Sequence, residues 1–525
     1  MGFIRLVNVS FHYQDSDSLV FDHLNLEINT NWRGGIVARN GRGKTTLLKL
    51  IHGVEEVSQG SLLKDCETDL FPLEIRTPYL SVLSIIKNYL GPYEACERMM
   101  QDFLEGRTDE DSYFEALNQY LEFDGYEIES RIKRECHPLG LDEEALNRPY
   151  ETLSGGEQTK VQMIMLFLKS HTFILLDEPT NHLDAEGIQL LAQYLKTKQG
   201  FLIVSHHRDF LDECIDHVIA IEKEQLTVMQ GTYRTYEQEY EWKKELEQHQ
   251  RLKIEKEVNR LEVAARERRH WSHAKEKEKI GAGDKGFVTH RAAKLMKRAL
   301  SVERRINEQL EEKKALVKYR EHQPYLLIKQ EQVPKVVLQV SHLKVAFGER
   351  VILNDICFQL ESGERLAITG PNGSGKSTLI KTILGELPYQ DGFIKLDNRV
   401  HIAYVSQFPR YKEGNLREIL RDESLEETRF RSILGALSCH RDIFERDLST
   451  FSLGELRKVD IARSLYHKNQ LLIWDEPLNG LDIMNRQAIE AAILASNATM
   501  IFIEHDQTFI DKVATHQLEL MKYNK

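Results

Sequence analysis

The sequence predicts an α/β protein in which two P-loop domains are joined by a long α-helical hairpin. Three observations lead to this prediction. The 525 residues exceed the size of one ordinary domain. A series of sequence blocks occurs twice in the same order, and the stretch between the two series has almost no glycine or proline. We therefore expect domains at residues 1–228 and 335–525, and a linker at 229–334 whose tip lies near 279–290.

The repeat is clearest around two lysines, where residues 34–50 (GGIVARNGRGKTTLLKL) align with residues 366–382 (LAITGPNGSGKSTLIKT). Three later blocks recur in order: ETLSGGEQ with TFSLGELR, FILLDEPTNHLD with LLIWDEPLNGLD, and LIVSHHRDF with IFIEHDQTF. In each copy, short β-branched apolar runs alternate with longer helical patterns. This alternation is typical of a mainly parallel sheet with helices on its faces.

The linker carries apolar residues at helical spacing on its way out and on its way back. They are Ile254, Val258, Leu261 and Ala265, then Ala299, Ile306, Leu310 and Val317. Two helices with such stripes can pack along each other. A glycine-rich break at residues 280–286 favours a turn between them. A helix of about 40 residues is about 60 Å long, so the hairpin is expected to extend well beyond either domain.

Positive charge is concentrated in this linker. The whole chain has a net charge of −12, yet residues 241–320 hold 23 Lys and Arg against 14 Asp and Glu. Residues 285–302 contain no acidic residue. Segregated charge with nearby aromatic side chains is typical of a segment that enters a nucleic acid, although a solvated spacer stays open as the alternative. Candidate RNA or tRNA contacts are Lys279, Lys285, Phe287, Arg291, Lys294, Lys297 and Arg298.

Composition excludes several classes of protein. With 41% hydrophobic and 29% charged residues the chain can bury cores, but it has no apolar run near the roughly 18 residues of a membrane helix. The N-terminal residues do not resemble a secretory signal, so we expect a cytoplasmic protein. The six cysteines are scattered singly, without the spacing of a metal site or a disulfide framework.

Two phosphate-binding loops are predicted. The second copy has a complete GxxxxGK[ST] motif from Gly370 to Ser377, and the first copy differs by an alanine, Ala38, at the opening position. Backbone N–H groups of such a loop surround phosphates, the lysine contacts the β and γ oxygens, and the following hydroxyl binds Mg²⁺. Candidate ATP ligands are Asn40, Gly41, Gly43, Lys44, Thr45 and Thr46, and Gly370, Asn372, Gly373, Gly375, Lys376, Ser377 and Thr378.

Paired carboxylates end an apolar strand in each copy, Asp177-Glu178 and Asp475-Glu476. The aspartate is expected to hold Mg²⁺ together with Thr45 or Ser377, and the glutamate to act as general base for the attacking water. We therefore expect Mg²⁺-dependent ATP hydrolysis.

Leu153-Ser-Gly-Gly-Glu157 resembles the signature motif of ATP-binding-cassette (ABC) proteins. The resemblance implies that the signature of each domain contacts the ATP bound by the other. The first ATP site would join Lys44, Glu178 and His206 to Ser452 and Gly454, and the second would join Lys376, Glu476 and His505 to Ser154, Gly155 and Gly156. It also implies that His206 and His505 bind the γ-phosphate, that Tyr13 and Phe347 stack on adenine, and that Gln407 senses Mg²⁺.

Three departures from the ABC pattern fall on the first ATP site. They are Ala38, the second signature with Leu453 in place of glycine, and Phe71-Pro72-Leu73 where a glutamine is expected. We therefore expect the first site to hydrolyse ATP more slowly than the second.

Two cassettes joined by a charged hairpin resemble the ABC-F family of ribosome-associated ATPases, and residues 283–298 are most similar to its antibiotic-resistance members. The resemblance implies a monomer with paired cassettes, ribosomal RNA and peptidyl tRNA as partners, and no membrane subunit. In such members ATP binding favours ribosome association, the linker enters the exit-tRNA site, and hydrolysis releases the protein.

Other interpretations stay open. The chain could be a housekeeping ABC-F factor in translation or ribosome assembly, or the ATPase subunit of a transporter. The additional segment at residues 93–132 of the first copy is either a short arm that contacts the ribosome or an enlarged helical subdomain.

Overall fold

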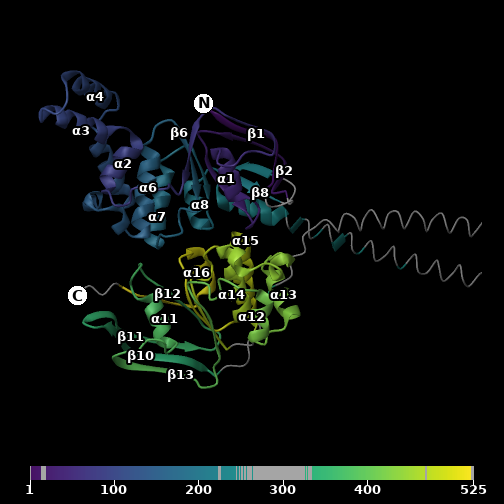
Figure 1. Ribbon diagram of the computed structural model, residues 1–525. Helices are drawn as coiled ribbons and strands as arrows, with labels where there is room; N and C mark the ends of the chain where they lie inside the picture. The colour runs from purple at the N-terminus through teal and green to yellow at the C-terminus, as the bar shows by residue number, and fades with distance from the viewer. Residues whose placement is uncertain are drawn as a thin grey trace, which may run out of the picture. The chain divides into compact units, whose positions relative to one another are not determined.

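The computed structural model describes residues 2–13, 19–222, 226–243, 334–466 and 470–521, with a few scattered residues between 245 and 328. The chain divides into two compact units, Met1–Arg234 with Pro324–Lys525, and Thr235–Gln323. We call the part before Arg234 the first domain and the part after residue 334 the second domain (Figure 1). The predicted hairpin tip and its seven candidate RNA contacts lie outside the described residues.

The first domain is built on a six-stranded sheet, parallel except at one edge. Its strands lie in the order β5 (Glu67–Phe71), β6 (Thr172–Asp177), β7 (Phe201–Val204), β3 (Arg33–Ala38), β8 (His217–Ile221) and β9 (Leu226–Gln230). Only the β8–β9 pair is antiparallel. A separate antiparallel sheet consists of β2 (Phe21–Asn29), β1 (Phe3–Phe11) and β4 (Gln59–Lys64).

The helices of the first domain follow the P-loop, fill the segment between β5 and β6, and connect the later strands. They are α1 (Lys44–His52), α2 (Val82–Leu90), α3 (Tyr93–Leu104), α4 (Glu110–Glu122), α5 (Ile128–Cys136), α6 (Gly155–Leu168), α7 (Ala185–Lys196) and α8 (Arg208–Cys214), with short 3₁₀ turns at His137–Leu139, Glu143–Asn147 and Tyr150–Thr152.

The second domain repeats this topology. Its parallel sheet has the order β14 (Ile402–Val405), β15 (Leu471–Asp475), β16 (Met500–Ile503), β12 (Arg365–Thr369) and β17 (His516–Glu519). Its antiparallel sheet consists of β11 (Arg350–Glu361), β10 (Val336–Phe347) and β13 (Asp391–Leu396). The predicted repeat of two α/β domains with mainly parallel sheets is confirmed.

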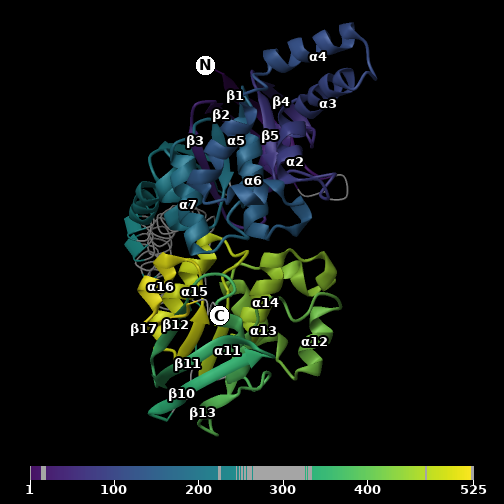
Figure 2. The same cartoon turned by 90° about the vertical axis from the view of Figure 1, so that its left-hand side faces the viewer.

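The helices of the second domain occupy matching positions. They are α11 (Lys376–Ile383), α12 (Leu416–Asp422), α13 (Glu427–Ala436), α14 (Leu453–Tyr466), α15 (Ile483–Ser496) and α16 (Gln507–Val513), with 3₁₀ turns at Arg441–Phe444 and Leu448–Thr450. Figure 2 shows α13 beside α14.

Apolar side chains bury the sheets on both sides. In the first domain, Ile4 and Leu6 of β1 join Leu47 and Ile51 of α1 in one core with the central strands. In the second domain, a matching core lies between β10, α11 and the parallel sheet. A further core of the second domain packs α12 to α16 against the sheet around the fully buried Trp474. Ile174 and Leu176 of β6 alternate with Phe173 and Leu175 of the first-domain core and are buried as well, so each parallel sheet is covered on both faces, as such sheets require.

Residues 93–132 are helical, as expected from the sequence. Figure 1 shows α3 and α4 side by side at one end of the first domain. The rings of Phe103 and Tyr113 join the two helices with centroids 4.8 Å apart. In the described part of the chain, no helix is long and apolar enough to cross a membrane.

Candidate ATP sites

The strand order brings the motifs of each domain together. β6, β7 and β3 are neighbours, and the P-loop, the paired carboxylates and the histidine each follow the carboxyl end of one of them. The same holds for β15, β16 and β12. Parallel strands end at a common edge of the sheet, where ligands of open α/β folds bind.

Each P-loop leads into a helix through a glycine in the left-handed region. Gly43 precedes α1 with φ 84°, and Gly375 precedes α11 with φ 95°. A Cβ at Gly43 would come within 2.7 Å of Phe21, and one at Gly375 within 2.8 Å of Ile352, so a side chain is excluded at both positions. The helix N-termini present backbone N–H groups and a positive dipole end, which suit phosphate.

Each P-loop lysine donates hydrogen bonds within its own loop. Lys376 Nζ donates to the carbonyl oxygens of Gly370 at 2.8 Å and Pro371 at 3.1 Å. Lys44 Nζ donates to Ala38 O and to Asn40 Oδ1, both at 3.1 Å. Both lysines are buried, so each places a cation inside its loop.

The two P-loops differ at the first residue of the motif. Gly370 has φ 134°, and a Cβ there would lie 2.2 Å from the Leu520 carbonyl oxygen. Ala38 instead is the last residue of β3 and is paired with Ile221 of β8. The structure accommodates Ala38 because β3 extends to this position, so the residue does not need the positive φ that Gly370 has.

Aspartate and hydroxyl side chains meet where Mg²⁺ was predicted. The Thr45 hydroxyl lies beside Asp177, and the Ser377 hydroxyl lies beside Asp475. Burial raises the pKa of Asp177, and it raises the pKa of Asp475 to about 6. Asp475 Oδ1 is buried and accepts no hydrogen bond from the described residues. A buried carboxylate oxygen that accepts no hydrogen bond is suited to bind a divalent cation such as Mg²⁺, which prefers oxygen ligands.

The glutamates that follow have equal backbone geometry. Glu178 and Glu476 both have φ 51°, which is uncommon for a residue with a side chain. His206 Nε2 lies 3.1 Å from Glu178 Oε1, and His505 Nε2 lies 3.4 Å from Glu476 Oε1. The structure therefore brings the predicted base and the predicted histidine into contact in both domains.

The electrostatic environments of the two glutamates differ. Burial raises the pKa of Glu178 to about 8. Burial alone would raise the pKa of Glu476 too, but hydrogen bonds from His505 and Gln407 hold it below its ordinary value. Near neutral pH the first glutamate is therefore mostly protonated, and the second is ionised and ready to accept a proton. Burial also lowers the pKa of His206 well below its usual range, so this imidazole is neutral.

Gln407 follows β14 and faces the second glutamate. Its Nε2 donates to Glu476 Oε2 at 3.2 Å, and Asn479 Nδ2 donates to the same oxygen at 2.7 Å. At the matching place of the first domain, the Leu73 N–H donates to Gln162 Oε1 of α6 at 2.8 Å. The first domain thus holds this loop through its backbone, with Leu73 where the second domain has a glutamine.

The first P-loop contacts the second domain. The Asn40 N–H donates to Asp482 Oδ2 at 2.9 Å, and its Nδ2 donates to Gly480 O at 2.7 Å. A Cβ on Gly454 would lie 2.9 Å from Asn40 Nδ2, which places the second signature against this loop. On the opposite side, the Asn372 N–H donates to Asp184 Oδ2 at 3.4 Å.

The signature serines begin their helices. Ser154 forms a reciprocal capping box with Glu157 at the start of α6. Ser452 makes the same contacts with Glu455: its N–H donates to Glu455 Oε2 at 2.9 Å, and its Oγ accepts from the Glu455 N–H at 3.3 Å. The replacement of glycine by Leu453, which is 55% exposed, leaves this cap intact.

The predicted adenine contacts are exposed aromatic side chains. Tyr13 is 38% exposed, and its hydroxyl lies 2.8 Å from Thr46 Oγ1 of α1. Phe347 ends β10 and is 52% exposed. An exposed ring beside the P-loop helix, as Tyr13 has, suits a stacked base.

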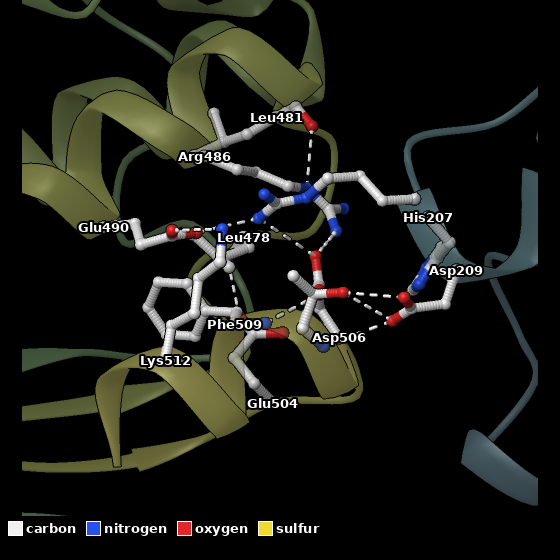
Figure 3. Close-up of polar contacts among 12 residues, drawn as sticks. His207, Asp209, Leu478, Leu481, Arg486, Glu490, Glu504, Asp506, Phe509 and Lys512 are labelled. Carbon is white, nitrogen blue, oxygen red and sulfur yellow. Dashed lines mark hydrogen bonds and ion pairs between the residues drawn. The ribbon is translucent and has the colours of Figure 1, made fainter. Parts of the chain in front are cut away.

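A polar cluster, buried at Arg208 and exposed at Asp209, joins the domains just after His206 and His505 in the chain. Arg208 Nη2 lies 2.9 Å from Glu490 Oε2, and Thr508 Oγ1 donates to Asp209 at 2.7 Å. Figure 3 shows Glu490 and Arg486 of α15 together with Asp506, opposite Asp209 of the first domain.

Sequence reasoning missed several residues of these sites. Asp482 and Asp184 bind the opposite P-loop, Asn479 orients Glu476, and Lys458 is 4% exposed on α14. The aspartates stand in the repeated LD pair that ends each carboxylate block, which was the available signal.

Comparison with known protein families also distinguishes two domains in the chain. The ABC transporter family matches residues 21–181 and 353–479, one stretch in each domain. The chain therefore belongs to the ABC transporter family and carries two of its ATPase domains. It is an ATP hydrolase, as the sequence predicted.

Relatives cover nearly the whole chain. The ribosome protection protein VmlR of Bacillus subtilis is 28% identical over 524 residues, which span 98% of this chain and 86% of VmlR. The energy-dependent translational throttle protein EttA of Mycobacterium tuberculosis is 25% identical over 532 residues, spanning 96% of this chain and 88% of EttA. The probable ATP-binding protein YheS of Escherichia coli O6:H1 is 29% identical over 499 residues, with 93% and 74% coverage.

Solved structures share the fold. The archaeal ribosome recycling factor aABCE1, solved in complex with the ribosomal stalk protein aP1, aligns with a TM-score of 0.57 at 19% identity. The alignment covers 98% of this chain and 87% of that one. The fold of the chain is thus shared with a known structure.

Proposed function

We propose that the protein is an ABC-F ATPase that binds the ribosome in its ATP-bound, closed form and protects it from antibiotics at the peptidyl-transferase centre. The observation that carries this proposal is the pairing of the two domains through their P-loops, with Asn40 bound to Asp482 and Gly480 and Asn372 bound to Asp184. Two ATP molecules held at such contacts would join the domains. The chain thus contains the parts of a nucleotide-controlled clamp.

ATP is held by the P-loop of one domain and the signature of the other. Lys44 and Lys376 bind β and γ oxygens, while Ser452 and Ser154 approach the γ-phosphate from the opposite domain. Thr45 with Asp177, and Ser377 with Asp475, would hold Mg²⁺, which neutralises charge on the β- and γ-phosphates.

Glu476 is the general base of the second site. It is ionised, and the amide groups of Gln407 and Asn479 orient its Oε2, so it can take a proton from the attacking water. His505 lies beside it and can donate a hydrogen bond to the γ-phosphate. Glu178 and His206 have the same roles in the first site, where the raised pKa of Glu178 makes hydrolysis slower.

Ribosome binding is supported by the names of relatives and by charge. VmlR is a ribosome protection protein and EttA a translational throttle protein, and both align with this chain over nearly its whole length. The basic residues concentrate between 241 and 320, while the rest of the chain is acidic. The linker would therefore be the element that enters RNA, at the exit-tRNA site, with contacts to ribosomal RNA and peptidyl tRNA.

Hydrolysis would open the domains and release the ribosome. In this scheme the protein acts in the cytoplasm as a monomer, without a membrane subunit. Lys279, Lys285, Phe287, Arg291, Lys294, Lys297 and Arg298 are the proposed contacts of the linker tip.

A housekeeping role in translation is the second candidate, favoured by the similarity to EttA along 96% of the chain. Deletion of the gene separates the two. Protection predicts a lower inhibitory concentration for drugs of the peptidyl-transferase centre, with unchanged growth in their absence. Slow growth without drug and unchanged drug sensitivity would favour the housekeeping role. Co-purification with membranes would favour a transporter subunit over both.

A further inference from the structure

Arg457 is a buried cation that the ATP sites described above leave without a role. It lies on α14, five residues after the signature serine Ser452, and is 1% exposed. Burying a guanidinium costs free energy unless its N–H groups have hydrogen-bond acceptors. A buried arginine at this position therefore indicates a specific structural or functional role.

The guanidinium of Arg457 donates hydrogen bonds to the backbone of residues 406–407, which we call the glutamine loop of the second domain. Nη1 donates to the carbonyl oxygen of Ser406, and Nη2 donates to the carbonyl oxygen of Gln407. Two parallel donors on neighbouring carbonyls fix both the distance and the orientation of that backbone, which a single-donor side chain cannot do. The side-chain amide of Gln407 then donates to Glu476 Oε2 at 3.2 Å.

Negative groups surround the guanidinium. The carboxylates of Asp460, Glu504 and Glu476 act on its charge, and so does Asp475. The cation therefore lies within electrostatic range of the two acidic residues of the second ATP site, but it donates to the backbone of the glutamine loop and not to them.

The N-terminal turn of α14, just before Arg457, belongs to the first ATP site. Ser452 caps this helix, and Gly454 in its first turn lies against Asn40 of the first P-loop. The start of α14 thus contacts one ATP site and, through Arg457 about one turn further along, holds the loop that orients the catalytic glutamate of the other.

The first domain is built differently at the matching position. Thr159 stands five residues after Ser154, and its hydroxyl donates to Gly155 O within its own helix at 3.1 Å. The loop at Leu73 is held by Gln162 instead. The arginine link is thus present in one direction only.

We propose that Arg457 is a positioning residue that couples the signature segment at the first ATP site to the catalytic glutamate of the second. A shift of α14 when the signature engages ATP is transmitted through the two carbonyls to Gln407 and from its amide to Glu476. The proposal rests on the assignment of Glu476 as general base, and it is independent of ribosome binding.

The test is ATP hydrolysis by the full-length chain without ribosomes. Glu178→Gln leaves hydrolysis at the second site, and Glu476→Gln leaves hydrolysis at the first. In the Glu178→Gln background, Arg457→Thr, which introduces the residue of the first domain, is expected to lower kcat about tenfold because the glutamine loop is misplaced. The KM for ATP should stay within about twofold, since no ATP contact is removed.

Two further variants separate positioning from general loss of structure. Arg457→Lys keeps the charge but has one nitrogen, so it should restore only part of the rate. In the Glu476→Gln background, Arg457→Thr should change the first-site rate by less than about twofold. A double-mutant cycle with Ser452→Ala on second-site turnover should be non-additive, because the two residues act through one helix.

The proposal is overturned if Arg457→Thr leaves second-site kcat unchanged, lowers both sites equally, or adds independently to Ser452→Ala. If the Glu178→Gln protein hydrolyses no ATP at all, the assignment of Glu476 fails and the coupling fails with it. Since no ribosomes are present, none of these outcomes bears on the proposed ribosomal function.

Discussion

The amide nitrogen of Gln407 donates a hydrogen bond to Oε2 of Glu476 at 3.2 Å, whereas the matching place in the first domain is occupied by Leu73. The two ATP sites are therefore chemically different although their strands and loops repeat. This difference leads to the first prediction.

Gln407→Ala is expected to lower second-site hydrolysis by about tenfold or more, because the general base loses one of the groups that orient it. Steady-state ATPase in the Glu178→Gln background measures the effect. Leu73→Ala in the Glu476→Gln background is the matched control and should leave first-site kcat within about twofold. Equal losses at both sites would contradict the proposed role of the glutamine.

The pH dependence of the two sites should differ. Glu178 has a pKa raised to about 8, and a base is active only when it is deprotonated, so first-site hydrolysis should rise as pH increases from 7 to 9. At pH 7 about a tenth of Glu178 is ionised, which predicts about a tenfold gain toward the plateau.

The pKa of Glu476 is lowered, so second-site hydrolysis should be flat over the same range. Rates of the Glu476→Gln and Glu178→Gln proteins at a series of pH values test this contrast. Superimposable profiles would show that the environments of the two glutamates do not control their chemistry.

The opening residues of the two P-loops should respond differently to substitution. Gly370→Ala places a Cβ 2.2 Å from the Leu520 carbonyl oxygen at a φ of 134°, so it should strongly weaken nucleotide binding at the second site. Ala38→Gly removes only a methyl group at the end of β3 and should change first-site binding little. The KM for ATP checks both, measured for Gly370→Ala in the Glu178→Gln background and for Ala38→Gly in the Glu476→Gln background; an unchanged KM for Gly370→Ala would refute the steric argument.

The ion pair of Arg208 with Glu490 should stabilise the contact between the domains. Both side chains are buried, at 4% and 9% exposure, and Lys512 Nζ stays 2.9 Å from the other oxygen of Glu490, so Arg208→Ala removes one of two cationic partners and should cost about 1.5–3 kcal/mol. Denaturant unfolding measures this loss.

The exposed pair of Arg5 and Glu27, at 45% and 60% exposure, is the control for that experiment. Its removal by Arg5→Ala should cost at most about 1 kcal/mol. Equal small losses for both substitutions would mean that the contact between the domains in Figure 3 adds no stability.

Much of the fold could be predicted, and so could the part of each ATP site that a single domain contributes, because the residues involved are close together in the sequence. Lys376 and Ser377 are adjacent in the chain, and Asp475 and Glu476 directly follow a buried strand, so spacing alone indicates their chemistry. The repeat then fixed the number of domains and their common topology.

The remaining features depend on partners that are distant in the sequence. From the sequence, Arg457 is expected to be an ordinary surface arginine of a helix. Only the fold shows that it donates to the carbonyl oxygens of Ser406 and Gln407, about 50 positions earlier. The Asn40 contact with Asp482 joins residues 442 positions apart. Likewise, the sequence reveals the substitution at Ala38 but not that β3 extends through it.

The most direct test of the central claim is ribosome binding by the Glu178→Gln, Glu476→Gln double variant. Both general bases are removed while both P-loops remain, so ATP should hold the domains closed. The account predicts that this variant co-sediments with 70S ribosomes in ATP, fails to do so without nucleotide, and inhibits translation. The absence of ATP-dependent co-sedimentation would contradict the account and direct attention to a different partner.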